Sequence, residues 1–503
     1  MSLSRSWRAE AQSRAAMQHE HTVVTRRLIQ TATLIALMSA VGGCALGPDY
    51  ERPVIDDPQA YRQPTRAGDS IANLSWWQQY QDPQMRALIE LALAENNDLA
   101  IAVARIEEAR ARYGFVRADQ FPRIDGAAGA TRGNQAGAFI PGIGVQEQYV
   151  LAGGVSWEVD LFGKLRRSSE AARAELLATE EARRAVTITL IADVASAYLL
   201  LRDLDTRYEI SQRTLKTRQD STALVTARFD MGTVALIDVN QAQIEEADAA
   251  VQVAALERTV IQTENLINVL VGRNPGQILR QRNTKLRLAP PNVPAGLPSE
   301  LLERRPDVRQ AEQQLAAQTA RIGIAEAMRW PSLNLTASLG LASTDLSDLL
   351  DSDAKIWDIS GNLFAPIFNS GQNKRRVEVE KARTEQLLNA YEQTVLQAFR
   401  EVEDALTGIR TLHNEARARE GQVAAARSAA TLSRARYDGG VTSYLEVLES
   451  ERSLFRAELA ESSVRREQLV SVVSLYKALG GGWTQDLVPI ASMQPAGGVQ
   501  TGP

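Results

Sequence analysis

The longest pattern in the chain is helical. In 165–229, which contains no proline, apolar residues recur every three or four positions, and the same spacing runs from Leu388 to Leu412. This spacing is typical of coiled-coil helices. A shorter helical pattern follows each of these stretches. We therefore predict two long helical hairpins, over 165–272 and 373–480. At a rise of about 1.5 Å per residue, the first helix of each hairpin is about 95 Å long.

Within 123–160 and 332–367, three segments alternate apolar and polar residues with a period of two, over 155–160, 333–341 and 357–363, and a fourth strand is expected to begin at Arg123. The alternation is regular over 333–341 (Leu-Asn-Leu-Thr-Ala-Ser-Leu-Gly-Leu). A strand with this pattern has one apolar and one polar face. Strands of about 10 residues with such faces are typical of a transmembrane β-barrel. Half of a soluble β-sandwich is the alternative that the strands alone leave open.

Four strands per chain limit what the sheet can be. The smallest closed barrels have about 8 strands. An open sheet edge in lipid leaves backbone groups without hydrogen-bond partners, which is prohibitively costly. If these strands span a membrane, several chains therefore contribute to one barrel.

The chain also repeats itself over about half its length. The residues 227–232 (Ala-Arg-Phe-Asp-Met-Gly) are echoed 208 positions later by 435–440 (Ala-Arg-Tyr-Asp-Gly-Gly), and Gly272 is echoed by Gly480. This period is too long for a solenoid, whose units run about 20–50 residues. It predicts a duplicated half-molecule.

The N-terminal region resembles a bacterial export signal. Arg26 and Arg27 precede a mostly apolar run over 28–41, and Gly42-Gly43-Cys44 follows. A basic segment, a short apolar segment and small residues before a cleavage point form a secretory signal. The end of this run resembles the lipobox, which implies that Cys44 is acylated and begins the mature chain. An N-terminal anchor helix, or an incidental cysteine, is the alternative.

These patterns define the expected organisation. The fold class is mixed α+β and mostly α, with an internal duplication. Helices over 85–119 and 299–328 are expected to enter the two pairs of strands. The expected boundaries are a signal peptide over 1–43, a lipidated N-terminal tether over 44–82, a first repeat over 83–290, a second repeat over 291–482 and a flexible C-terminal tail over 483–503.

Composition argues against several classes of function. The net charge of −5 does not indicate a nucleic-acid surface. The chain has one cysteine and three histidines, and His413 is the single histidine after the signal. A Ser-His-Asp triad and the usual Cys and His metal sites therefore lack members. We expect no enzymatic activity, no metal and no cofactor.

Further motifs give the chain a family resemblance. Cys44 begins the stretch Cys-Ala-Leu-Gly-Pro-Asp-Tyr-Glu-Arg-Pro, and 476–483 reads Tyr-Lys-Ala-Leu-Gly-Gly-Gly-Trp. With the lipobox and the duplication, these stretches make the chain resemble the TolC-type outer-membrane efflux lipoproteins over roughly 44–485. The resemblance implies a homotrimer with a twelve-strand barrel in the outer membrane and a twelve-helix α-barrel in the periplasm. It implies a passive exit duct for drugs or other small toxic compounds. A periplasmic adaptor and an inner-membrane transporter, of the RND type, are the implied partners.

The resemblance also assigns functional residues to the two hairpin tips. It implies a closed gate in which Tyr437 donates a hydrogen bond to Asp238 of the neighbouring hairpin, and acidic rings at Glu446 and Glu449. A solvated helix face is the alternative for the two glutamates. The tip residues expected to contact the adaptor are Arg228, Gly232, Arg436 and Gly440. The chain departs from TolC at Thr442 and Ile237, where TolC has Arg and Thr, so the latch between those two positions is absent.

Two other functions remain open from the sequence. A duct for type I protein secretion would have the same fold. A periplasmic coiled-coil adaptor or scaffold could also carry a lipid and helical hairpins, but would not have two pairs of amphipathic strands. The substrate is not specified, because a passive duct need not select it.

The lipobox predicts that Cys44 carries a lipid. Cells grown with labelled palmitate should label the wild-type protein and should not label Cys44→Ser, because the serine hydroxyl replaces the thiol that is acylated. Equal label in the two proteins would contradict acylation at this position. We expect the Cys44→Ser protein to insert in the outer membrane, since the apolar strand faces do not depend on the anchor.

Overall fold

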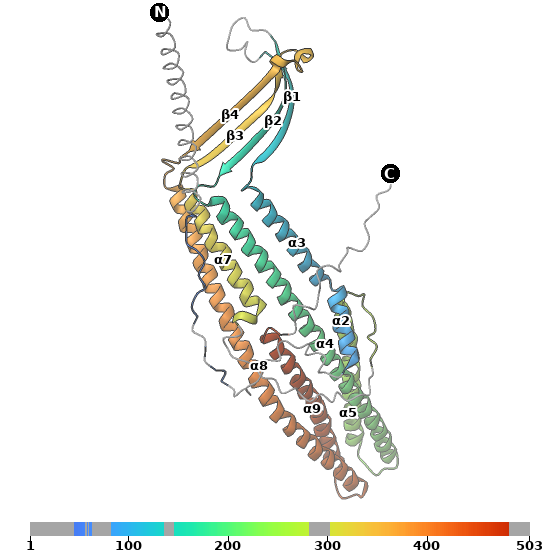
Figure 1. Cartoon of the computed structure of the whole chain (residues 1–503). Helices are drawn as coiled ribbons and strands as arrows, with labels where there is room; N and C mark the ends of the chain where they lie inside the picture. Colours follow the sequence, from blue (N-terminus) through green and yellow to red (C-terminus); the bar gives the residue numbers. More distant parts are fainter. Residues whose placement is uncertain are drawn as a thin grey trace, which may run out of the picture. The chain divides into compact units, whose positions relative to one another are not determined.

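The computed structural model describes residues 45–55, 58, 60–62, 82–134, 145–280 and 302–481 (Figure 1). Cys44, the expected signal peptide and the expected C-terminal tail lie outside the described residues. Within them, the predicted combination of very long helices with four strands is confirmed. Two compact units make up the chain: one holds the N-terminal residues to Glu51 with Ala109–Glu175 and Leu315–Leu387, and the other holds the remainder.

Helices and strands follow one another in the same order in the two halves of the chain. The first half contains α2 (Pro83–Glu95), α3 (Asn97–Ala118), β1 (Arg123–Gly133), β2 (Gln146–Val159), α4 (Lys164–Asp230) and α5 (Leu236–Leu270). The second half contains α7 (Pro306–Ala327), β3 (Ser332–Ser343), the short 3₁₀ helices η4 (Leu346–Asp348) and η5 (Ser352–Ala354), β4 (Lys355–Phe364), α8 (Gln372–Asp438) and α9 (Tyr444–Ala478). Helices α4 and α8 both have 67 residues, and α5 and α9 both have 35.

The four strands form one antiparallel sheet in the order β1-β2-β3-β4 (Figure 1). Its register places like residues side by side. Trp357 of β4 lies opposite Leu339 of β3, and Thr336 lies opposite Ser360, with 2.9 Å between the two hydroxyl oxygens. The outer edges of β1 and β4 pair with no other strand in the described part of the chain. The sheet therefore has an apolar face, a polar face and two open edges.

The apolar face of this sheet is exposed in the single chain. Trp357 is 74% exposed and Leu339 is 70% exposed, although aromatic and aliphatic side chains in a sheet normally pack against a second layer. The period-two pattern thus predicted the faces correctly. Among the described residues no second layer covers this face, whereas in a β-sandwich a second sheet would cover it.

The helix expected over 85–119 is broken in the structure. Asn96 has an extended backbone between α2 and α3. Its side-chain oxygen accepts a hydrogen bond from the backbone N–H of Leu99 at 2.9 Å, and its amide donates to the backbone oxygen of Leu270 at 2.8 Å. Asn96 thus caps α3 and ties it to the end of α5. An N-cap of this kind is worth about 1 kcal/mol.

The helix expected over 299–328 is also interrupted, at Arg305. Residues 302–304 are helical, but Arg305 is not, and α7 begins at Pro306. A residue that precedes proline is sterically disfavoured in the helical conformation, and proline is favoured at the first helical position. Arg305 is buried, pairs with Asp307 at 2.6 Å and donates to the backbone oxygen of Ala478 at 2.9 Å. Burial acts to raise the pKa of Asp307, but the Arg305 guanidinium holds it below its usual range.

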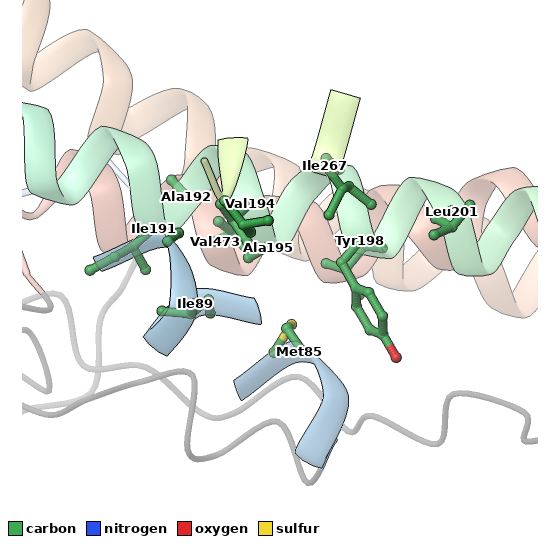
Figure 2. Packing of buried hydrophobic residues seen from close by; sticks show 14 of the residues in the cluster. Met85, Ile89, Ile191, Ala192, Val194, Ala195, Tyr198, Leu201, Ile267 and Val473 are labelled. Atoms are coloured by element: carbon green, nitrogen blue, oxygen red, sulfur yellow. The ribbon is translucent and has the colours of Figure 1, made fainter. Parts of the chain in front are cut away.

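The main apolar core lies in the second unit, around the middle of α4. Figure 2 shows Met85 and Ile89 of α2 directed towards Val194 and Tyr198 of α4. Ile267 of α5 and residues of α9 belong to the same cluster. Among the described helices, α4 is the one whose length and composition would allow it to cross a membrane. However, 56% of that apolar window is buried inside the chain, which is typical of a core helix.

Candidate functional site

The two hairpin turns are built in the same way. Gly232 and Gly440 have φ values of +75° and +72°, a conformation that favours glycine. The backbone N–H of Thr233 donates to the oxygen of Arg228 at 2.9 Å, and that of Val441 donates to the oxygen of Arg436 at 2.9 Å. This is the Schellman pattern that ends a helix. No atom lies near the missing side chain of either glycine, so backbone conformation alone requires them.

A small apolar cluster joins the two tips. Its buried members come from both hairpins, and they are Val225, Val239, Ala242, Tyr437, Tyr444, Val447 and Leu448. The rings of Tyr437 and Tyr444 lie 5.3 Å apart. Burial raises the pKa of Tyr444 to about 12. The tip of α4–α5 and the tip of α8–α9 are thus held in one packed group, which we call the tip cluster.

Arg228 lies across this cluster. Its guanidinium carbon is 4.9 Å from the centre of the Tyr437 ring, within the range of a cation–π interaction. The same group is 3.6 Å from the carboxylate of Asp438. Arg228 is therefore largely engaged within the chain, where it links the end of α4 to the end of α8.

The predicted hydrogen bond between Tyr437 and Asp238 is not formed within the single chain. Tyr437 is buried, and its hydroxyl has no hydrogen-bond partner among the described residues. Asp238 lies in the first turn of α5, where the helix dipole favours a negative charge. A hydrogen bond between Tyr437 and an acceptor on another copy stays a prediction.

Glu446 and Glu449 both lie beside arginines of their own hairpin. Arg436 is 3.3 Å from the carboxylate of Glu446, which also accepts a hydrogen bond from the hydroxyl of Thr442. Arg452 is 3.8 Å from the carboxylate of Glu449, which is 67% exposed. Each of the two carboxylates therefore has an arginine beside it within the single chain, and the acidic rings stay a prediction.

Sequence reasoning missed a buried charge group above the tip cluster. Glu245 of α5 is 3% exposed and pairs with Arg218 of α4 at 2.9 Å and with Arg452 of α9 at 2.5 Å. Nearby, burial raises the pKa of Glu451 above its usual range, although Arg434 lies 3.4 Å away. The signal was present in the sequence, since Glu245 interrupts the buried row of Val239, Ala242 and Ala249 in α5.

The outer surface of the tips is apolar at several places. Met231 and Val441 in the turns are exposed, as are Leu236, Ile237 and Leu445 at the starts of the returning helices. The described residues contain no group of three or more His, Cys, Asp or Glu side chains placed to hold a metal ion. The exposed apolar residues of the tips can therefore pack against another helical surface, and the charged residues of the tips can attract or repel ions.

The chain is similar to known proteins over most of its length. The sequence pattern of the outer membrane efflux protein family matches residues 88–273 and 297–481. The cation efflux system protein CusC of Escherichia coli O6:H1 is 34% identical over 451 residues, which cover 89% of this chain and 97% of CusC. The solvent efflux pump outer membrane protein SrpC of Pseudomonas putida is 36% identical over 455 residues, which cover 88% and 96%.

The structural similarity extends over the same length. The crystal structure of the open state of the MtrE outer membrane channel of Neisseria gonorrhoeae matches with a TM-score of 0.77 and 32% identity, over 87% of this chain and 98% of MtrE. Sequence and fold thus agree. The chain belongs to the outer membrane efflux protein family and serves as an outer-membrane exit duct of an efflux pump.

Proposed function

We propose that this chain is one third of a passive, trimeric exit duct. The observation that carries the proposal is the four-strand sheet with an exposed apolar face and two open edges. Three copies joined edge to edge would form a twelve-strand barrel without open edges. Lipid would then cover the apolar face, and every backbone group in the membrane would have a partner.

The helices support a tunnel of the same symmetry. Each chain contributes α4, α5, α8 and α9, so that three chains contribute twelve helices. The equal lengths of α4 and α8, and of α5 and α9, support an internal duplication with repeats over 83–290 and 291–482. Such a duct has no chemical step of its own, and an attached transporter supplies the energy.

The partners and substrates of the pump are proposed from the relatives and from the tips. The exposed apolar residues around Gly232 and Gly440 are suited to packing against the helices of a periplasmic adaptor, which would join the duct to an inner-membrane transporter of the RND type. CusC is named for cations and SrpC for solvents, at nearly equal identity to this chain. We therefore propose small toxic compounds as the substrate class and assign no particular one.

The assembly is tested on the purified wild-type protein. Native mass spectrometry in detergent should show three copies, because the two open edges of each sheet need partner strands and the resemblance to TolC-type channels implies three chains. The same sample should form ion-conducting channels in planar bilayers. A stable monomer that keeps its full β-content, or a trimer that never conducts, would contradict the proposed duct.

The gate is proposed to lie at the tip cluster, with Tyr437 donating to Asp238 of a neighbouring hairpin. A hydrogen bond to a charged acceptor contributes about 1.5–3 kcal/mol, and threefold symmetry repeats it. Tyr437→Phe combined with Asp238→Ala should therefore raise the single-channel conductance in planar bilayers. Asp248→Ala, which removes an exposed carboxylate from the same helix, is the control and should leave conductance unchanged. Unchanged conductance in the trimeric double variant would exclude this latch.

The acidic residues of α9 are proposed to set ion selectivity at the same constriction. Rings of carboxylates favour cations in a narrow pore, and the neighbouring Arg436 and Arg452 leave a reduced negative charge there. Glu446→Gln combined with Glu449→Gln should lower cation selectivity and weaken block by multivalent cations. Reversal potentials in a salt gradient measure this, with Glu415→Gln and Glu420→Gln as exposed controls on α8. Unchanged selectivity would make these carboxylates a solvated face.

A further inference from the structure

The two helical hairpins meet along a seam that contains several buried carboxylates. Three acids with side chains no more than one tenth exposed lie at successive levels above the tip cluster, and they are Glu245, Glu458 and Asp203. On α9 the contacting residues extend from Arg452, which is nearest the tip, to Arg466. On α4, which runs antiparallel to α9, they extend from Arg218, which is nearest the tip, to Asp203. At about 1.5 Å per residue, this column extends about 20 Å along the seam.

Each acid contacts one arginine of its own hairpin and one of the other hairpin. Glu458 of α9 shows this most clearly. Its two carboxylate oxygens accept hydrogen bonds from Arg427 of α8 and from Arg213 of α4, both at 2.7 Å. One carboxylate thus bridges the two hairpins with equal bonds on both sides.

The other two levels also place one arginine of each hairpin beside the acid, at hydrogen-bond distance for Glu245 and at longer ion-pair distances for Asp203. Glu245 of α5 is held by Arg218 of its own hairpin and by Arg452 of the other. Asp203 of α4 lies 3.8 Å from Arg207 of its own helix. It accepts a hydrogen bond from Ser462 of α9 at 2.5 Å, and Arg466 lies 3.6 Å away. We call these three groups the carboxylate ladder.

This arrangement has a physical consequence for separating the hairpins. Breaking a buried ion pair is strongly unfavourable when it leaves one charge without a partner. Here each carboxylate keeps an arginine of its own hairpin when the other hairpin moves away, so neither state contains an isolated buried charge. An apolar seam would instead expose a continuous hydrophobic surface on opening. The ladder therefore favours one docked geometry while keeping undocking reversible.

We propose that the carboxylate ladder is the clasp that holds the second hairpin against the first in the closed duct, and that opening proceeds by release of its cross-hairpin arginines while the own-hairpin arginines stay bound. The proposal rests on the duct function proposed above. It assigns gate-positioning roles to Arg213, Arg452 and Arg466, which lie above the tip cluster. It also supplies a closing contact in a chain that lacks the latch at Thr442 and Ile237.

The two arginines of Glu458 provide a matched test. They bind the same carboxylate at the same distance, and their side chains are 58% and 64% exposed for Arg213 and Arg427. Arg213→Met removes the cross-hairpin contact, whereas Arg427→Met removes the own-hairpin contact. Both keep the aliphatic stem and delete one charge. For half-exposed pairs, the first should shift the closed–open equilibrium towards the open state by about twofold to fivefold, and the second should not.

Single-channel recordings of the full-length trimers in planar bilayers measure this shift as the ratio of open to closed dwell times. The double variant Arg213→Met with Arg452→Met should shift the ratio further in the same direction. Equal effects of Arg213→Met and Arg427→Met, or no effect of either, would overturn the clasp. If a methionine variant does not assemble, Arg213→Gln and Arg427→Gln repeat the comparison with polar side chains. A wild-type protein that forms no channel would instead refute the proposed duct, so the two failures are distinct.

Discussion

Backbone hydrogen bonding in lipid is the constraint on which the design of this chain depends. The sheet β1-β2-β3-β4 has an exposed apolar face, as a membrane strand needs, but the outer edges of β1 and β4 lack strand partners in the described chain. Water could solvate such edges, whereas hydrocarbon cannot. A membrane location, which the family provides, therefore requires other copies to complete the sheet. In this way a local property of two strand edges makes the proposed duct an oligomer, and the family resemblance supplies the number of three chains.

The helical half of the molecule faces the opposite requirement. A tunnel wall that never opened could be sealed with leucine and valine, as the core around Val194 and Tyr198 is. Near the tips the apolar contact is small, and the seam contains Glu245, Glu458 and their arginines. Buried ion pairs contribute little net stability compared with apolar residues of similar volume, but they can specify geometry. The apolar core therefore lies in the part of the hairpins that stays packed. The charged seam lies in the part that we propose to move.

The tips are also held together within the single chain. Arg228, Tyr437 and Asp438 contact one another within the chain, and the turns at Gly232 and Gly440 follow one backbone pattern.

The sequence by itself determined the features that depend on periodic or local patterns. The period of two located three of the four strands and their apolar faces, because alternate side chains of a strand point to opposite sides. The spacing of three and four predicted the long helices, and the repeated Gly232 and Gly440 marked their turns. The motifs were sufficient for the family. Two local signals were present but not used. Pro306 sets the start of α7, and Asn96 interrupts the helix expected over 85–119.

Only the tertiary structure decided which charged residues meet. Glu245 and Arg452 are 207 positions apart, and Arg213 and Glu458 are 245 apart. Periodicity shows that a charge lies on a buried face, but does not show which arginine of another helix reaches it, because that depends on the axial shift between two hairpins. Glu446 and Glu449 are a different case, because their arginines belong to the same hairpin. Arg452 follows Glu449 by three residues on α9, a spacing that the sequence shows, whereas Arg436 reaches Glu446 from α8 across the turn. Contacts between hairpins come from packing, which no local pattern encodes.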